Sequence, residues 1–187
     1  MYTSLETREE DIKIHGYYAT PPEATRLLLS RERFEGHCIH EPCSGGGHIA
    51  RVLEEAGYRV RCSDVRDGDD VYGERGVNLF TLRGPFENTV TNPKVSEAAA
   101  VAEHLLAITT GKVALLMPWH LLPTLARRPD YEPPRRVYLF VQFLPFLVGG
   151  DPCRINRTTK YWAWYVYEKG YSGPTEVTPV HLGTGWS

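Results

Sequence analysis

A run of three glycines between two different hydrophobic patterns constrains this chain more than any other feature. Residues 37–43, HCIHEPC, are typical of a short strand, and residues 48–56 place apolar side chains at helical spacing until Gly57 ends the pattern. The intervening SGGG allows a tight turn, and the helix that follows presents free N–H groups to an anion. The spacing matches neither a dinucleotide-binding nor an ATP-binding loop. The segment therefore predicts strand, glycine turn and helix, with either a nucleotide-like ligand or a plain connection at the turn.

The alternation of strand and helix patterns continues along the chain. Further strands are predicted at residues 58–65, 87–94 and 112–119, and further helices at 20–29 and 96–111. Thr20 and Ser96 are the expected N-caps of these helices, with Pro21 at the first helical position. Residues 135–148 and 160–170 are aromatic strands without a helix between them, which favours an antiparallel pair. We expect one α/β domain spanning residues 1–187, with a mainly parallel sheet and an antiparallel strand near its C-terminal end.

Composition excludes several classes of protein. The chain has 187 residues, of which 42% are hydrophobic and 24% charged, a mixture typical of one globular domain. It contains no run of about 18 apolar residues that would span a bilayer. The N-terminal stretch is acidic and lacks the basic and apolar regions of a secretory signal. We therefore expect a cytoplasmic protein without membrane insertion.

The cysteines and histidines around the glycine turn suggest a metal site only weakly. Four cysteines are too few and too irregularly spaced for a disulfide scaffold. In a strand, His37 points to one face while Cys38 and His40 point to the other, so these side chains do not converge on one ion. We expect no metal, and interpret the cysteines as small buried residues beside the turn.

An acidic residue ends the strand that follows the first helix. Asp64 lies about 20 residues beyond the glycine turn, where a carboxylate accepts hydrogen bonds from both hydroxyls of a ribose. The alternative is a turn-forming aspartate in the series with Asp67, Asp69 and Asp70. The position after the second strand favours ribose binding.

Basic residues gather toward the C-terminal third of the sequence. They are Arg127, Arg128, Arg135, Arg136, Arg154, Arg157 and Lys160. Two interpretations stand equally: a surface patch that neutralises the phosphates of DNA, or ordinary solvated arginines, since neighbours in sequence need not be neighbours in space.

Four segments occur in an order that resembles a known family. TPPEAT at residues 20–25, EPCSGGGHIA at 41–50, Asp64, and TNPK at 91–94 resemble the S-adenosylmethionine-dependent DNA methyltransferases that modify the N6 amine of adenine, especially the compact versions of phages and prophages. The resemblance extends from about residue 14 to about residue 170. It implies a Rossmann-like class I methyltransferase fold, S-adenosylmethionine as cofactor and DNA as partner.

The resemblance also implies a set of cofactor-binding residues. They are Tyr18, Thr20, Pro21, Glu41, Pro42, Gly45, Gly47, Asp64, Asn78 and Phe80. The first three lie at the methionine end, the stretch from Glu41 to Gly47 wraps the cofactor, and Asp64 binds the ribose. The last two are an imperfect match to an Asp-Phe pair that touches the cofactor adenine.

The catalytic motif of that family is Asn or Asp, Pro, Pro and an aromatic residue, and this chain has Asn92, Pro93, Lys94 and Val95. An exocyclic adenine amine is a poor nucleophile because its lone pair is delocalised into the ring. The Asn92 side-chain oxygen and the Pro93 carbonyl would accept both amine hydrogens and favour attack on the sulfonium methyl group. Neither a metal nor a covalent intermediate is required. By itself, TNPK would be interpreted as a turn that ends a strand.

The departure at the last two motif positions leaves three explanations. The family's aromatic residue stacks on a flipped base, and Val95 offers far less surface. Another aromatic residue supplies the stacking, namely Tyr17, Trp119, Phe143 or Phe146; or the substrate is not a flipped adenine; or activity is lost while the cofactor pocket is kept.

The function expected from the resemblance is therefore methyl transfer to adenine N6 in DNA. We expect that the chain has no room for a separate target-recognition domain. Contacts to the bases would then come from loops such as 66–76 and 127–136 or from a partner, and we expect weak sequence specificity. Two alternatives remain: a catalytically degenerate protein that binds the cofactor or associates with nucleic acid, and a methyltransferase of a protein glutamine amide.

Overall fold

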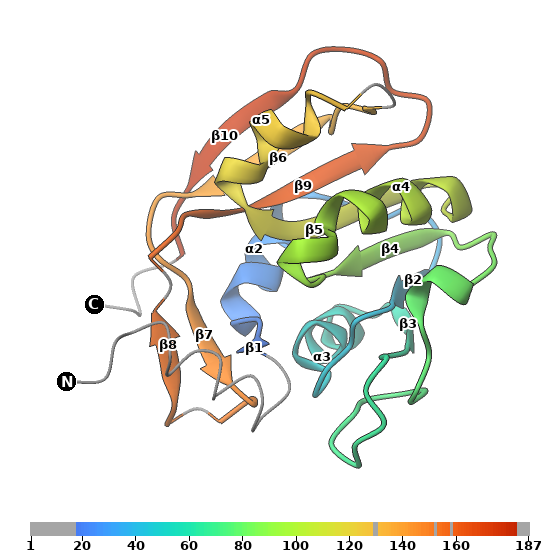
Figure 1. Ribbon diagram of the computed structural model, residues 1–187, viewed down its shortest axis with the longest axis vertical. Coiled ribbons are helices and arrows are strands. Elements are labelled where there is room, and N and C mark those ends of the chain that lie inside the picture. Colours follow the sequence, from blue (N-terminus) through green and yellow to red (C-terminus); the bar gives the residue numbers. More distant parts are fainter. Residues whose placement is uncertain (1–17, 129–130, 152, 158, 183–187) are drawn as a thin grey trace.

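A seven-stranded sheet forms the centre of the molecule. The computed structural model describes residues 18–128, 131–151, 153–157 and 159–182. From one edge to the other, the sheet contains β10 (Glu176–Val180), β6 (Arg136–Phe140), β9 (Trp162–Glu168), β5 (Lys112–Pro118), β4 (Asn88–Thr91), β2 (Cys38–Glu41) and β3 (Arg59–Cys62) (Figure 1). Strand β9 is antiparallel to β5 and β6, and the other neighbouring pairs are parallel. The α/β fold expected from the sequence is confirmed.

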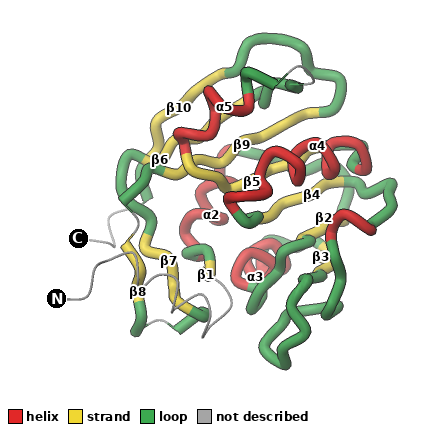
Figure 2. Tube along the Cα trace, viewed as in Figure 1, coloured by secondary structure: helices red, strands yellow, loops and turns green. Residues whose placement is uncertain are grey.

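Helices cover both faces of this sheet, as the alternating pattern predicts (Figure 2). Helices α2 (Pro22–Arg31) and α3 (His48–Glu55) pack on one face, and α4 (Ala98–Ile108) and α5 (Leu122–Leu125) on the other. Successive side chains of β5 divide between the two cores: Ala114 and Leu116 join the first, and Val113 and Leu115 the second. Strand β5 is thus buried on both sides, which explains its continuous apolar run.

A small second sheet brings residues 18–19 beside residues 145–157. It has the order β1-β7-β8, formed by β1 (Tyr18–Ala19), β7 (Pro145–Val148) and β8 (Ile155–Arg157). Tyr18 pairs with Val148. The strand predicted over residues 135–148 is therefore two strands in different sheets, because the chain leaves the large sheet after Phe140 and turns back beside β1. Strand β10, which the sequence analysis did not predict, pairs with β6 at the edge.

Between β3 and β4 the chain forms a long loop rather than a further strand and helix (Figure 2). A single bridge from Ser63 to Glu74 and a bond from the Val77 N–H to the Asp64 carbonyl (2.8 Å) hold its two halves beside β3. The 3-10 helix η1 (Leu79–Thr81) follows. This loop therefore starts and ends next to the strand that carries Asp64.

The two predicted helix caps are wrong. The N-cap of α2 is Pro21, without a side-chain bond, and Ser96 lies in the 3-10 helix η2 (Val95–Glu97) that precedes α4. Proline near the start of α2 fixes a helical φ without a capping side chain. The hydroxyl of Thr20 has a different partner, described below.

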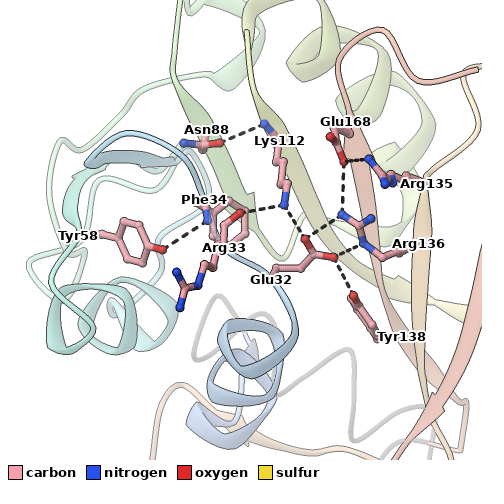
Figure 3. A network of polar contacts seen from close by, with 10 residues as sticks. All are labelled: Glu32, Arg33, Phe34, Tyr58, Asn88, Lys112, Arg135, Arg136, Tyr138 and Glu168. Carbon is pink, nitrogen blue, oxygen red and sulfur yellow. Dashed lines mark hydrogen bonds and ion pairs between the residues drawn. The ribbon is translucent and has the colours of Figure 1, made fainter.

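The C-terminal end of α2 is anchored to the sheet through a buried carboxylate (Figure 3). Glu32 accepts hydrogen bonds from Lys112 Nζ (2.7 Å), Tyr138 Oη (2.7 Å) and Arg136 Nη2 (2.9 Å). Burial would raise the pKa of Glu32, but these donors together lower it, so the carboxylate is ionised. Helix α2, which begins beside Thr20 and Pro21, is thereby held against β5 and β6.

Candidate functional site

Three predicted polar residues lie at the same edge of the sheet. Glu41 is the last residue of β2, Asp64 follows β3 by two positions, and Asn92 follows β4 directly. Strands β2, β3 and β4 are parallel neighbours, so their carboxyl ends meet. The chain passes from β2 to β3 on one side and later returns to β4 on the other, and such a reversal opens a crevice that binds ligands in α/β sheets.

The glycine turn has the conformation that its sequence requires. Gly45 and Gly47 have positive φ values of 51° and 79°. A Cβ atom on Gly47 would lie 2.5 Å from the ring of Tyr72. Both the backbone conformation and the close approach of Tyr72 therefore select glycine at position 47.

Two residues that the sequence analysis missed hold this turn in place. The Ser44 hydroxyl donates to the carbonyls of Ser63 (3.2 Å) and Tyr72 (2.8 Å), and the Tyr72 N–H donates to the Gly45 carbonyl (2.9 Å). The serine in SGGG was a visible signal for Ser44, whereas nothing local indicated Tyr72. The turn is thus fixed between the end of β3 and loop 66–76.

Asp64 connects the glycine turn to its own strand end. One carboxylate oxygen accepts the Gly45 N–H (2.8 Å) and the other accepts the Arg66 N–H (2.9 Å). The residue is only 7% exposed. The structure brings Asp64 and Gly45 together as predicted, with a carboxylate oriented by two backbone donors.

The proposed adenine-contacting pair lies close to Asp64. The Val77 N–H donates to the Asp64 carbonyl, which places the next residue, Asn78, close to Asp64. The Asn78 side chain accepts the Phe80 N–H (3.0 Å) and caps η1, while the Phe80 ring is 37% exposed and contacts His104. The Asn78 oxygen therefore shapes the loop, and the Phe80 ring provides the available apolar surface.

Glu41 has a buried oxygen without a partner among the described residues. Burial raises the pKa of this carboxyl, while the Ala50 N–H partly opposes the shift; the side chain is 1% exposed and its Oε2 lacks a hydrogen bond. Pro42 is also buried. Burial raises the pKa of the adjacent Cys43 thiol to about 12, so it is protonated and unsuited to act as a nucleophile.

The TNPK segment contacts the N-terminal TPPEAT segment directly. Asn92 Nδ2 donates to the hydroxyl of Thr20 at 3.1 Å. Thr20, Pro21 and Pro93 are buried, and Tyr18 is half-buried in β1. Two segments predicted to act together but far apart in sequence are therefore adjacent.

The aromatic candidates for base stacking differ in exposure. Phe146 is 2% exposed and packs against Trp162, so it cannot stack on a base, and Tyr17 lies outside the described residues. Trp119 is half-buried. Phe143 is 46% exposed, and its ring centroid lies 5.1 Å from that of the exposed Tyr161.

Of the two interpretations of the basic residues, the structure favours separate side chains over one patch, because they lie in different places and three of them pair with acids. Arg128 pairs with Glu103, Arg135 with Glu168, and Arg136 with Glu32. Arg127 follows α5, and Arg135 and Arg136 lie at the amino end of β6. Arg154 and Arg157 are at β8, and Lys160 precedes β9 near the catalytic edge.

The described parts of the two loops that we expected to contact DNA bases, 66–76 and 127–136, are not placed beside Asn92. The described residues 131–136 lead to the amino end of β6, at the edge opposite Asn92. Loop 66–76 is tied to the glycine turn through Tyr72. Neither arrangement favours these loops as the contact surface for an acceptor at Asn92.

Within the described ranges, no group of three or more His, Cys, Asp or Glu side chains is arranged to hold a metal ion. His40 stacks on Phe86 with ring centroids 4.1 Å apart. None of the helices in the described part of the chain is both long and apolar enough to traverse a bilayer.

Comparison with known proteins identifies the fold. Neither protein-family models nor curated protein sequences match this chain. A solved candidate RNA methyltransferase from Pyrococcus horikoshii is 12% identical with a TM-score of 0.59, over 82% of this chain and 87% of that one. A modification subunit of a candidate type I restriction enzyme from Vibrio vulnificus is 11% identical with a TM-score of 0.59, over 97% of this chain and 51% of that one. The chain has the class I methyltransferase fold.

The chain spans only part of some of the structures that it resembles. It covers about half of the Vibrio subunit, and 56% of a magnesium protoporphyrin IX methyltransferase from Synechocystis, for which the TM-score is 0.41 and the identity 18%. At these identities, the likeness concerns the fold.

Proposed function

We propose that this protein is an S-adenosylmethionine-dependent methyltransferase that modifies the N6 amine of adenine in DNA. The observation that carries the proposal is the Asn92–Thr20 contact at the edge where Asp64 and the glycine turn meet. A nucleoside site at the reversal of strand order and an asparagine oriented beside it are the two parts that this reaction would need.

The residues present fit the cofactor. The buried Glu41 Oε2 lacks a donor, and the Asp64 carboxylate has lone pairs beyond those that accept two backbone N–H groups. When bound, the cofactor would supply an electrophilic methyl group on a sulfonium. We assign its binding to Tyr18, Thr20, Pro21, Glu41, Pro42, Gly45, Gly47, Asp64, Asn78 and Phe80. Asp64 would bind the ribose, and the exposed Phe80 ring would contact the adenine.

The orientation of Asn92 suits it to bind an amine. Because its Nδ2 donates to Thr20, its Oδ1 is the group left to accept a hydrogen from the substrate. The Pro93 carbonyl would accept the second amine hydrogen. Two acceptors draw the amine toward a tetrahedral geometry in which its lone pair is aimed at the methyl carbon. The nitrogen then loses one proton to solvent.

Base stacking would come from Phe143 rather than from the catalytic motif. Val95 is 36% exposed and offers a small surface, whereas the Phe143 ring is exposed and supported by Tyr161. A ring from the β6–β7 loop would recover part of the energy lost when a base leaves its stack.

A catalytically degenerate protein is the second candidate, favoured by one observation. Lys94 is exposed and paired with Glu97 at 3.4 Å, so a flexible cation stands where the family has a rigid proline. Methylation of a protein glutamine is a third candidate, because Asn92 would accept the hydrogens of that planar amide equally well.

Two measurements on purified protein test these candidates. Calorimetry with S-adenosylmethionine should show binding, and labelled methyl transfer should occur to adenine-containing DNA but not to the same DNA with N6-methyladenine. Asn92→Ala is the control that should retain cofactor binding and lose transfer. Binding without transfer to DNA or protein supports the degenerate protein, and label on protein alone supports the glutamine enzyme. A folded sample that does not bind the cofactor contradicts all three.

A further inference from the structure

The order of strands leaves one part of the catalytic edge for the methyl acceptor. The glycine turn and Asp64 follow β2 and β3, and Asn92 follows β4. Beyond β4 the sheet continues with β5, β9 and β6. A cofactor in the crevice at β2 would therefore have its acceptor on the opposite side of Asn92, over the ends of those three strands (Figure 1).

The residues at these strand ends are exposed and chemically mixed. The Trp119 N–H donates to the Tyr161 carbonyl (2.9 Å), so Lys160 and Tyr161 adjoin the carboxyl end of β5. The rings of Tyr161 (49% exposed) and Phe143 (46% exposed) are in contact. Lys160 is exposed as well. Within the described chain, this edge thus combines exposed aromatic rings with a neighbouring cation.

The β7–β8 hairpin adds a second cation to the same edge. The Val148 N–H donates to the Arg154 carbonyl (2.9 Å), and Val148 pairs with Tyr18 of the N-terminal motif. The hairpin turn also reaches the start of α3, where the backbone of Gly150 hydrogen bonds to the His48 side chain. Arg154 is exposed. The hairpin therefore borders the cofactor crevice on the side of the acceptor.

We propose that Phe143, Arg154, Lys160 and Tyr161 form a docking track for single-stranded DNA, in which Phe143 and Tyr161 stack on bases and Arg154 and Lys160 bind phosphates. This inference rests on the proposed function, because it places the substrate of that same site. Exposed rings beside cations are the combination by which proteins bind unpaired strands, whose bases are free to stack. An acidic peptide would need only the cations, and an apolar peptide only the aromatic rings.

Equilibrium binding of a fluorescent single-stranded oligonucleotide, measured by anisotropy at several salt concentrations, tests the track. The Arg154→Gln/Lys160→Gln variant should bind roughly tenfold more weakly at about 50 mM salt. The slope of log K against log salt concentration should become less steep by about 1.4, since each lost phosphate contact to a single strand reduces that slope by about 0.7. Phe143→Leu/Tyr161→Leu should weaken binding without changing that slope. The matched control is Arg31→Gln/Arg33→Gln, which removes two exposed charges at the opposite edge and should bind as the wild type.

Cofactor binding by calorimetry, measured on each variant, verifies that the fold is intact. Wild-type affinity and slope in Arg154→Gln/Lys160→Gln would overturn the track, as would tighter wild-type binding to duplex DNA or to RNA of the same sequence. The proposed function is judged separately: wild-type methyl transfer to DNA with an unchanged KM for DNA in Arg154→Gln/Lys160→Gln, which leaves Phe143 in place, removes the track alone. A wild type that binds the strand but never methylates it removes the reaction and leaves the track.

Discussion

Asn92 and Thr20, 72 positions apart in the sequence, are joined by a 3.1 Å hydrogen bond from the asparagine amide to the threonine hydroxyl. The bond fixes the side-chain amide of Asn92 with its nitrogen toward Thr20, so in the proposed chemistry its oxygen would accept a hydrogen from the substrate amine. Thr20 thus acts as a positioning residue for the proposed chemistry, besides its place at the methionine end of the crevice.

Replacing Thr20 with valine keeps the shape of the side chain and removes the acceptor for Asn92. We expect kcat for DNA methylation to fall about fivefold, since loss of one hydrogen bond of ordinary strength costs about 1 kcal/mol. Thr20→Ser should restore the rate because it keeps the hydroxyl. Single-turnover transfer of labelled methyl measures the chemical step, and an unchanged rate in Thr20→Val would show that Asn92 is oriented by other contacts.

Replacing Asp64 with asparagine should weaken cofactor binding. The variant keeps the size of the side chain but offers a neutral acceptor in place of a carboxylate held by Gly45 and Arg66. A hydrogen bond to a charged group contributes about 1.5–3 kcal/mol, so we expect the Kd for S-adenosylmethionine to rise roughly tenfold to a hundredfold. Asp67→Asn, at an exposed position of the same loop, is the control. Equal calorimetric affinities of the two variants would argue against ribose binding by Asp64.

Restoring the family motif by Lys94→Pro/Val95→Tyr should raise DNA methylation. A tyrosine at the exposed position 95 adds a stacking surface, and base stacking contributes about 1–3 kcal/mol, which predicts at least about a fivefold rise in kcat/KM. The control is Glu97→Gln, which breaks the Lys94–Glu97 pair without adding a ring. If the double variant gains nothing over that control, the departure at positions 94 and 95 does not limit catalysis.

The sequence predicted what local patterns encode. The strand, glycine turn and helix around Gly45 follow from spacing alone, and the rule that parallel strands end at one edge brings Asp64 toward that turn. Hydrogen-bond partners that lie far apart in the sequence could not be predicted from local patterns. Nothing near Thr20 indicates that its hydroxyl serves Asn92 rather than its own helix, so a capping pattern gave the wrong partner.

The same limit explains the errors in the C-terminal third. In the sequence, the neighbours of Arg136 do not indicate its acidic partner. Its partner Glu32 lies 104 positions earlier, and the packing of α2 against β6 brings the two side chains together (Figure 3). Likewise, an apolar run such as residues 135–148 does not show where a strand leaves one sheet for another. That depends on the pairing of Tyr18 with Val148.

Removing the charge of Glu32 should destabilise the fold. Glu32→Gln leaves the partly buried Lys112 without the counter-ion Glu32 and leaves Arg136 with Glu168, and breaking a buried ion pair from one side costs about 3–5 kcal/mol. Urea denaturation measures the loss in free energy of unfolding. Arg26 pairs with Glu55 at the surface, so Glu55→Gln should cost less than about 1 kcal/mol. Similar losses in the two variants would contradict an anchoring role for Glu32.

Protonation of His40 should make the fold acid-sensitive in a specific pH range. The ring is 1% exposed and stacks on Phe86, and neither of its nitrogens has a hydrogen-bond partner among the described residues. Burial, assisted by nearby Arg61, lowers the pKa of His40 from 6.5 to about 4. Between these values the unfolded chain binds a proton that the folded chain does not, so the stabilisation is complete above pH 6.5 and declines as the pH falls toward 4. The total loss is about 3 kcal/mol.

The His40→Phe variant separates this effect from other titrations. Urea unfolding at about pH 7 and about pH 5 should show that the wild type loses about 2 kcal/mol more than His40→Phe over that interval. His37→Gln, at an exposed position next to the same strand, should lose as much as the wild type. His48, whose pKa burial also lowers, is unchanged in all three proteins and cancels in the comparison. Identical pH dependence in the wild type and His40→Phe would mean that the folded protein accommodates the imidazolium, through water or a local opening of the contact with Phe86.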